Sequence, residues 1–474
     1  MAPFRNFARF LMVTATMTVR TLNLVVPLAH KATDKRTAET AGSRRARSGA
    51  VSPLIGESLR RGDVDSTNHT PRPPSMPGIR TSTTATRTTT TATTSSAPGP
   101  SADQGERHHA DFTFEDLVQA YLDCRESKRN KPSALAFEQD LERNLFQLDD
   151  ELRAGTYRPG RSICFVITRP KPREVWAADF RDRIVHHLFH NRISPRFYAS
   201  FIADSCACIP GRGTLYAAER LEAKIRSITQ NWRRPAFYLK LDLANFFVSI
   251  DKAILRDQLA ARIREPWWMA LAETILFHDP RQDYLLRGNP ALLERVPPHK
   301  RLINQPAHLG LPIGNLSSQF FANVYLDALD QFVKHRIGAQ HYVRYVDDFI
   351  LLHDSPQWLN EARDHIEDFL TKVLAARLNP TKTILQPVER GVDFVGHVIK
   401  PWRRTTRQRT LNEVLRRVRE IPAENLFETA NSYFGLLRQA TQSHQDRARL
   451  ANTLRHRGHC IAGDLTKTYR RKSA

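Results

Sequence analysis

The sequence predicts an α+β protein. Two apolar, strand-forming runs flank the tetrapeptide Tyr345-Val-Asp-Asp348 and predict a hairpin whose tight turn carries two adjacent acids. A further strand is expected in residues 236–250, where an apolar run leads through Asp242 into an aromatic turn. Apolar residues at helical spacing predict helices near residues 411–418 and 430–437, each with one buried stripe and arginines on the other face.

The first 109 residues differ in kind from the rest of the chain. Residues 81–96 are almost entirely Thr, Ser and Ala, a composition that cannot bury enough apolar surface to fold. Residues 71–77 add a stiff, proline-bearing stretch. We therefore expect a disordered low-complexity tail over residues 1–110.

The extreme N-terminus resembles a weak secretory or organellar leader, because Arg5, Arg9 and Arg20 lie around apolar runs. Arg20 splits these runs into pieces far shorter than the roughly 20 residues of a membrane span. No small-x-small cleavage pattern follows. We expect translated upstream sequence or a disordered tail rather than a targeting segment.

Organised sequence begins near Phe112. Thr113 is expected to cap a helix that turns Leu117 and Tyr121 inward, and a second helix is expected over roughly residues 133–154. Residues 252–309 predict a helical, proline-punctuated insert whose place in the fold the sequence does not define.

Charge points to a polyanionic partner. The chain has a formal net charge of +22, and from Ala110 onward 56 Lys and Arg face 42 Asp and Glu. A basic excess of this size favours nucleic acid through counterion release. By charge alone, a ribosomal, membrane-surface or DNA-packing protein fits as well. The five scattered cysteines predict neither a zinc module nor a disulfide framework.

The acids carry the chemistry. Adjacent carboxylates inside an apolar strand pair are costly unless a cation offsets their charge, and paired carboxylates are the usual protein ligands of Mg²⁺ beside substrate phosphates. Asp242, Asp347 and Asp348 together suit a two-metal centre, with two Mg²⁺ ions and Mn²⁺ as a substitute. In the alternative interpretation, Asp242 only caps the following helix.

The same residues resemble the palm of a reverse transcriptase, in which a Tyr-x-Asp-Asp turn follows an Asp-x-x-x-Phe-Phe strand. The block Gly310-Leu-Pro-Ile-Gly314-Asn-Leu-Ser-Ser318-Gln319 resembles the loop and helix beside the incoming base. Ile313-Gly314 and Ser318-Gln319 stand where most reverse transcriptases have Gln-Gly and Ser-Pro, a variant that resembles the enzymes of bacterial diversity-generating retroelements. Further matching stretches bring the coverage to about residues 112–440, in the family's order; they are residues 169–173, 180–186, 378–382 and 391–396.

This resemblance implies a right-hand polymerase. We expect fingers over residues 111–234 and a palm over residues 235–400, built as an antiparallel sheet with helices on one face. A helical thumb and C-terminal region would follow over residues 401–474. The implied activity is RNA-directed DNA polymerisation, the extension of a 3′-hydroxyl on an RNA template with deoxynucleoside triphosphates.

Residue roles follow from the resemblance. Asp242, Asp347 and Asp348 would hold the metals, and Lys382 would protonate the leaving pyrophosphate. The nucleotide would be contacted by Lys171 and Arg173 at its triphosphate, by Phe247 as a wall against a ribose 2′-hydroxyl, and by Gln319 near the nascent pair. Four further positions are implied to contact nucleic acid: Arg183, Arg212, Gly314 and Tyr345.

Ordinary structural roles compete with several of these assignments. Lys171 and Arg173 fit a solvated basic strand, and Phe247 fits a core aromatic, as its neighbour Phe246 does. The amide of Gln319 suits a bond to backbone inside its helix. Lys382 fits an ordinary loop residue, and the turn around Arg212 a purely structural one.

The implied partners are an RNA template, a DNA or RNA primer, deoxynucleoside triphosphates and a small basic accessory protein, in the bacterial cytoplasm and without a membrane. Two alternatives stay open. One is a reverse transcriptase of antiviral defence. The other is a catalytically idle nucleic-acid-binding protein that keeps the palm as a scaffold.

Overall fold

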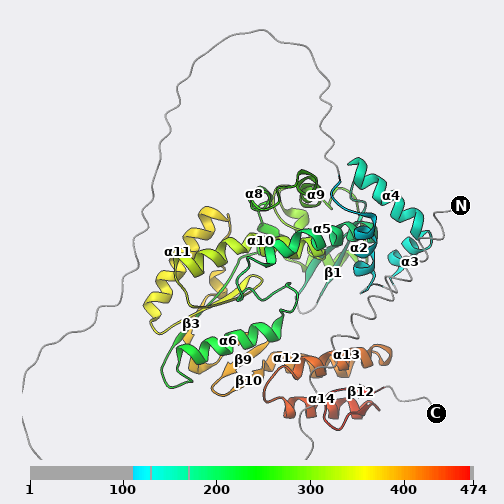
Figure 1. Cartoon of the computed structure of the whole chain (residues 1–474). Helices are drawn as coiled ribbons and strands as arrows, with labels where there is room; N and C mark the ends of the chain where they lie inside the picture. Colours follow the sequence, from blue (N-terminus) through cyan, green and yellow to red (C-terminus); the bar gives the residue numbers. More distant parts are fainter. Residues whose placement is uncertain (1–109, 127, 129–130, 169–170, 470–474) are drawn as a thin grey trace, which may run out of the picture. The chain divides into compact units, whose positions relative to one another are not determined.

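The computed structural model describes residues 110–126, 128, 131–168 and 171–469 (Figure 1). All of them belong to one compact unit, Met76–Ala474. Helices and strands are mixed along this part of the chain, which confirms the mixed α and β class. Apart from Ala110, the expected disordered tail lies outside the described residues. Within them, no helix combines the length and the apolar character that a membrane crossing requires.

A four-stranded antiparallel sheet organises the middle of the chain. Its strands are β3 (Phe237–Asp242), β5 (His341–Tyr345), β6 (Asp348–His353) and β7 (Ile384–Pro387), in the order β5-β6-β3-β7. β3 therefore lies between two strands that follow it by a hundred residues or more. β5 and β6 form the predicted hairpin.

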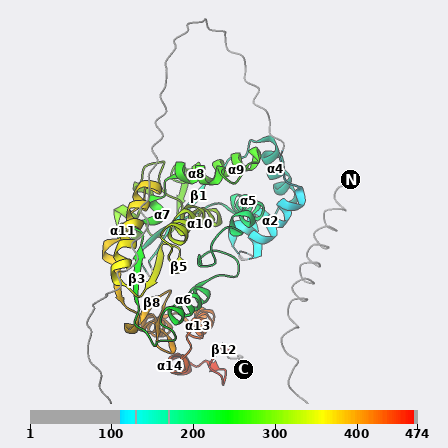
Figure 2. The same cartoon turned by 60° about the vertical axis from the view of Figure 1, so that its left-hand side comes forward.

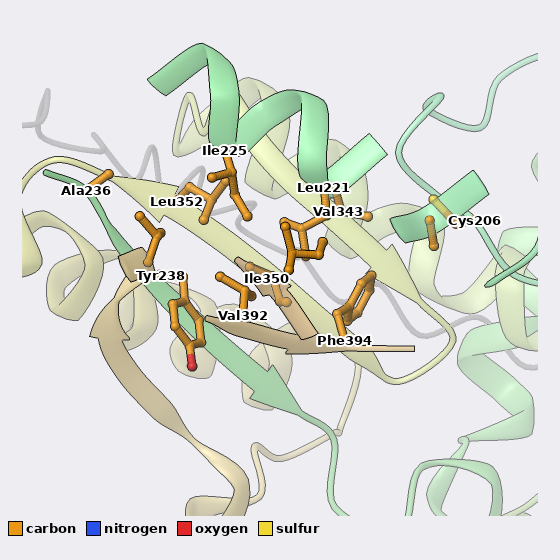
Figure 3. Packing of buried hydrophobic residues seen from close by; sticks show 13 residues of the cluster. Cys206, Leu221, Ile225, Ala236, Tyr238, Val343, Ile350, Leu352, Val392 and Phe394 are labelled. Atoms are coloured by element: carbon orange, nitrogen blue, oxygen red, sulfur yellow. The ribbon is translucent and has the colours of Figure 1, made fainter. Parts of the chain in front are cut away.

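Both faces of this sheet are covered, because alternate residues of each strand point to opposite sides. On one face, α6 (Thr214–Ile228) packs Leu221 and Ile225 against Val343 and Leu352 (Figure 3). The other face is covered by α10 (Leu316–Gln331) and α11 (Pro356–Val373), and α11 contacts β3 and β6. The expectation of helices on one face only is therefore wrong, since α6 seals apolar residues on the second face.

A smaller antiparallel sheet lies against the same face as α6. It consists of β8 (Val392–Phe394), β9 (His397–Lys400) and β10 (Arg403–Thr406). Its buried residues Val392, Phe394 and Ile399 belong to the core cluster that contains Leu221 and Val343 (Figure 3). This packing brings the segment that follows β7 back onto the central sheet.

The first part of the described chain is built from helices and a three-stranded sheet. Thr113 caps α2 (Phe114–Glu126) as expected: its hydroxyl accepts from the backbone N–H of Asp116, whose carboxylate accepts from the N–H of Thr113. The single helix expected over residues 133–154 is two helices, α3 (Pro132–Glu138) and α4 (Leu141–Ala154), separated at residues 139–140.

The strands of this part are β1 (Ser162–Ile167) and β2 (Arg173–Ala177), which pair in antiparallel fashion. A third strand comes from the insert: β4 (Tyr284–Leu286) pairs parallel to β1. The insert thus joins a sheet whose other strands lie more than a hundred residues earlier. α5 (Phe180–Tyr198) packs against α2 and α10.

The C-terminal part has its own apolar core. Leu411, Val418 and Phe434 are buried there beside Leu450 and Leu454. The helices are α12 (Gln408–Glu420), α13 (Ala423–Leu437) and α14 (His444–His456), and α13 and α14 lie side by side in Figure 2.

The remaining elements are α7 (Phe246–Ser249), α8 (Lys252–Ala260), α9 (Pro266–Phe277), β11 (Cys460–Ile461), β12 (Thr468–Tyr469), the 3-10 helices η1 (Pro290–Arg295), η2 (Pro298–Lys300), η3 (Leu302–Asn304), η5 (Pro380–Lys382) and η6 (Val388–Arg390), and the π-helical turn η4 (Phe332–Arg336).

Candidate active site

The three predicted acids meet at one end of the central sheet. Asp242 is the last residue of β3 and Asp348 the first of β6, and the two are direct partners in the strand register. Tyr345 pairs with Asp348 across the hairpin, which leaves Val346 and Asp347 as its two-residue turn. The backbone N–H of Leu243 donates to the carbonyl of Asp347 at 3.2 Å. Acids a hundred residues apart in sequence therefore lie side by side.

Helix capping does not account for Asp242. The acid that caps the next long helix, α8, is Asp251, whose carboxylate accepts from the N–H groups of Ala253 and Ile254. Asp242 is 5% exposed, and its contacts run to another part of the chain. Asn379 donates its side-chain amide to Asp242 Oδ1 at 3.3 Å and its backbone N–H to the Asp242 carbonyl at 2.8 Å.

Two lysines contact the acids. Lys382 Nζ lies 2.5 Å from Asp242 Oδ1, and Lys240 Nζ lies 3.2 Å from Asp348 Oδ2. Sequence reasoning missed Lys240, although one signal was present: it precedes Asp242 by two residues and therefore shares its face of β3. Lys240 also donates to the carbonyl of Asp393 at 3.1 Å, which links the acids to β8.

The acids repel one another. Burial, and after it the negative charges of Asp242 and Asp348, raise the pKa of Asp347 to about 6, while Lys382 acts in the opposite direction. A carboxylate in this position gains from a cation that offsets the shared negative charge. The cluster is therefore electrostatically suited to positive ligands.

This shift predicts that Asp347→Asn stabilises the metal-free protein near neutral pH. The folded state holds the Asp347 proton up to about pH 6, whereas the unfolded chain releases it near 3.8. Stability from this group is thus complete below pH 3.8 and is lost as pH rises to about 6. Asn removes the loss, so in EDTA the variant should have a higher Tm than the parent at pH 7 and the same Tm near pH 4.

Thermal unfolding from pH 4 to 8 checks this expectation. Asp150→Asn, at an exposed position of α4, serves as the matched control and should leave the pH profile of Tm unchanged. Equal Tm values for the parent and Asp347→Asn at pH 7 would contradict mutual repulsion among the acids.

Metal fit rests on the donors. Asp242, Asp347 and Asp348 supply carboxylate oxygens, the ligands that hard divalent cations prefer. Within the described ranges, however, no group of three or more His, Cys, Asp or Glu side chains is arranged to hold a metal ion. Lysine ammonium groups lie on two of the carboxylates instead. The donor chemistry of the three side chains fits a divalent cation.

Phe247 lies where the chain turns away from Asp242. It belongs to α7, a single helical turn, and its carbonyl accepts from the N–H of Leu311 at 2.8 Å. Phe246 is buried, 3% exposed, whereas Phe247 is half-buried. The two rings lie 5.5 Å apart at 68°. Phe246 is thus a core residue, as expected, and Phe247 retains an accessible surface.

The loop before α10 docks on β2. The N–H of Trp176 donates to the carbonyl of Ile313 at 2.7 Å, and the N–H of Ala178 donates to the side chain of Asn315 at 3.0 Å. Gly314 has φ +129°, and a Cβ there would lie 2.9 Å from Val175 Cγ1. Only glycine permits this approach without a shift. Gly314 therefore has a structural reason independent of any ligand.

Three of the four predicted nucleotide contacts are exposed. Gln319 projects from the first turns of α10, so the alternative in which its amide bonds backbone inside the helix finds no support. Lys171 and Arg173 are exposed where the β1–β2 connection enters β2, and residues 169–170 of that connection lie outside the described residues. These side chains are free to meet a ligand, and their roles stay predictions.

Two of the predicted nucleic-acid contacts, Arg183 and Arg212, have hydrogen-bond partners within the protein. Arg183 donates to the carbonyl of Ala178 at 2.8 Å. Arg212 donates to the carbonyls of Ile202 and Ser205, both at 2.8 Å. These bonds support the structural alternative for Arg212. Tyr345 is half-buried, and burial raises the pKa of its phenol.

Comparison with known proteins finds one family whose model matches part of the chain. Residues 169–399, a little under half of the chain, match the family described as "Reverse transcriptase (RNA-dependent DNA polymerase)". All three acids, Lys382, Phe247 and Gln319 fall inside the matched region. Such a domain indicates an RNA-directed DNA polymerase, which is a nucleotidyltransferase. No curated protein matches the chain.

Two solved structures are similar to this one. Apo telomerase from Candida tropicalis, truncated from its C-terminal domain, is 14% identical with a TM-score of 0.37, over 51% of this chain and 53% of that chain. Telomerase from Candida albicans in complex with a fragment of telomeric RNA is 14% identical with a TM-score of 0.36, over 63% of this chain and 56% of that chain. The chain thus spans just over half the length of each telomerase.

Proposed function

We propose, from the reverse transcriptase domain at residues 169–399, that the whole chain is an RNA-directed DNA polymerase. It would extend the 3′-hydroxyl of a DNA or RNA primer on an RNA template with deoxynucleoside triphosphates. One observation carries this proposal: Asp242 and Asp348 are cross-strand partners, with Asp347 on the adjoining turn. Phosphoryl transfer asks little more of a protein than such positioned charge.

Two Mg²⁺ ions, replaceable by Mn²⁺, are the proposed cofactors, held by Asp242, Asp347 and Asp348. When bound, such ions activate the attacking oxygen and stabilise the leaving one. Burial and the repulsion among the acids raise the pKa of Asp347, and this supports the assignment because the bare acids favour a cation. Lys240 and Lys382 hold Asp348 and Asp242 in place until then.

Lys382 is proposed as the proton donor to pyrophosphate. Its ammonium lies on Asp242, the acid at the end of β3, so it is already within the acid cluster. Its side chain is 44% exposed and can leave this contact for a phosphate. Lys171 and Arg173 are proposed to bind the triphosphate, since both are exposed cations.

Phe247 and Gln319 are proposed to contact the nucleotide. The carbonyl of Phe247 accepts from the N–H of Leu311, which fixes the backbone of Phe247 next to the loop that precedes α10. Gln319 is exposed on the helix that this loop starts. Arg183, Arg212, Gly314 and Tyr345 are proposed to act on nucleic acid mainly by shaping the surface around it.

The fingers, palm and thumb are proposed as residues 111–234, 235–400 and 401–474. The antiparallel sheet with the acids at its end supports a palm. β4 of the insert pairs with β1, which favours counting residues 284–286 with the fingers sheet. In α12, Arg409, Arg417 and Arg419 are exposed opposite the buried stripe, as a helix that grips a duplex backbone requires.

The subtype is proposed from residues 313–319. Ile313-Gly314 and Ser318-Gln319 resemble the diversity-generating retroelement enzymes, which would add a small basic accessory protein as partner and the bacterial cytoplasm as location. A reverse transcriptase of antiviral defence is the alternative within the class.

Primer extension on an RNA template tests the activity. The parent should incorporate deoxynucleotides in Mg²⁺, and the double variant Asp347→Ala, Asp348→Ala should fall to background, because both turn carboxylates are lost. Asp368→Ala, which removes an exposed acid on α11, is the matched control and should retain parental activity. Equal incorporation by the parent and the double variant would refute the proposed active site, and incorporation at background by both would favour the catalytically idle, nucleic-acid-binding alternative.

A further inference from the structure

Arg344 lies on β5 one residue before Tyr345, and its guanidinium is 1% exposed. All five of its N–H donors are bonded. Nε and Nη2 donate to the carboxylate of Asp330 at 2.8 and 2.7 Å. Nη2 also donates to Ser205 Oγ at 2.8 Å, and Nη1 donates to Asn323 Oδ1 at 3.3 Å and to the carbonyl of Val346 at 3.1 Å.

The backbone of Arg344 is held as firmly as its side chain. Its N–H donates to the carbonyl of Asp204, and its carbonyl accepts from the N–H of Cys206, each at 2.9 Å. Asn323 completes the connection, because its amide donates to the carbonyl of Ala207 at 2.8 Å. Arg344 therefore ties the segment 204–207 and the helix α10 to the turn that carries the acids.

Val346 has a backbone conformation that needs such support. Its φ is +56°, in the left-handed region that β-branched residues rarely adopt. Strained residues of this kind persist only where their surroundings over-determine them. The bond from Arg344 Nη1 to the Val346 carbonyl acts on this residue directly, and Asp347 follows it.

A buried ion pair contributes little net stability compared with packed apolar residues. The Arg344–Asp330 pair therefore calls for another reason, and the strained turn provides one. We propose that Arg344 is a positioning residue: through the Val346 carbonyl it fixes the turn and hence the orientation of Asp347 and Asp348. This inference rests on the proposed polymerase activity.

Arg344→Lys tests the inference. Lysine keeps the positive charge beside Asp330. It lacks the planar guanidinium whose fixed donors reach both the Asp330 carboxylate and the Val346 carbonyl. We expect kcat to fall about 10²-fold, the effect of a small misplacement of catalytic groups, with little change in KM for the nucleotide. Adding Val346→Gly to Arg344→Lys should then raise kcat about tenfold or more over Arg344→Lys alone, since glycine adopts positive φ without strain.

The matched control is Arg404→Lys. Arg404 is also buried and also joins a carboxylate, Glu222, to a backbone carbonyl, that of Gln439, but it lies in β10 rather than beside the turn. The Arg404→Lys variant should lose about as much Tm as Arg344→Lys but keep the parental kcat. Adding Val346→Gly to Arg404→Lys should not raise its kcat. An equal fall in kcat for both lysine variants, or no recovery by Val346→Gly, would overturn the inference.

Two measures keep the outcome decisive. Ser205→Ala replaces Arg344→Lys if that variant does not fold, because it removes only the hydroxyl that accepts from Arg344 Nη2. Ser205→Ala should lower kcat a few-fold, and the added Val346→Gly should restore it. An unchanged kcat in Ser205→Ala would refute the proposal. The Tm values of the same single and double variants give a test that does not depend on activity. Val346→Gly should change Tm more favourably in the Arg344→Lys background than in the parent. An inactive parent with this coupling intact would count against the polymerase proposal alone.

Discussion

Asp242→Asn will lower the rate of deoxynucleotide incorporation by about 10³-fold or more, as expected when a group that stabilises transition-state charge is removed. Asn has nearly the same shape, so the contacts of Asp242 with Asn379 keep a hydrogen-bonding partner and the fold should persist. The charge is lost, and with it one of the three carboxylates at the end of the sheet. Single-turnover primer extension on an RNA template measures the effect.

Asp251→Asn is the control for this prediction. Asp251 follows in the same segment but caps α8, a role that Asn fills equally well. It should therefore keep parental rates and parental Tm. If Asp242→Asn extended primers as fast as Asp251→Asn, Asp242 would not belong to the catalytic cluster.

Phe247→Ala should admit ribonucleotides. A half-buried ring, on a backbone that the hydrogen bond from Leu311 fixes, can exclude a 2′-hydroxyl by its bulk, without a hydrogen bond of its own. Removing it should narrow the preference for deoxynucleotides by about 10- to 100-fold, the range that a steric contact supplies. The ratio of kcat/KM for deoxy- and ribonucleotides gives the answer.

Phe246→Leu is the neighbouring control. Phe246 is buried in the core, so its truncation should lower Tm while the sugar preference stays unchanged. If Phe247→Ala kept the parental preference for deoxynucleotides over ribonucleotides, Phe247 would be a core aromatic, which is the competing interpretation of this residue.

Much of the central sheet follows from local sequence. The two apolar runs around Tyr345-Val-Asp-Asp348 predict a hairpin on periodicity alone, and the structure contains it. The pairing of β3 with β6 does not follow in this way, because no local pattern encodes which distant strand becomes a neighbour. Only the resemblance, through the order of its motifs, indicated that Asp242 and Asp348 meet.

The residues that sequence reasoning missed act through partners remote in the chain. Lys240 reads as an ordinary polar position on a strand, and its importance appears only with Asp348 and the Asp393 carbonyl beside it. Arg344 is a charge inside an apolar strand, which is a usable signal, since such a charge must be paired. Its partner Asp330 lies on a separate helix, α10, so the pairing could not be read from β5.

The insert at residues 252–309 and the helix expected over residues 133–154 also differ from what local sequence predicts because of distant contacts. β4 is only three residues long, and its pairing with β1 depends on contacts across more than a hundred residues. The break between α3 and α4 falls at Gln139 and Asp140, where neither Gly nor Pro marks an end. Tertiary packing decides both features, and periodicity alone does not reveal them.

The most direct test is the position of bound Mn²⁺, located by anomalous scattering in crystals with an RNA template, a primer lacking its 3′-hydroxyl and a deoxynucleoside triphosphate. We expect the ions at the end of β3, in contact with carboxylate oxygens of Asp242, Asp347 and Asp348 and with the triphosphate. Ions bound elsewhere, or a triphosphate whose metals leave Asp242 and the 347–348 turn without a ligand role, would contradict the assignment of this site.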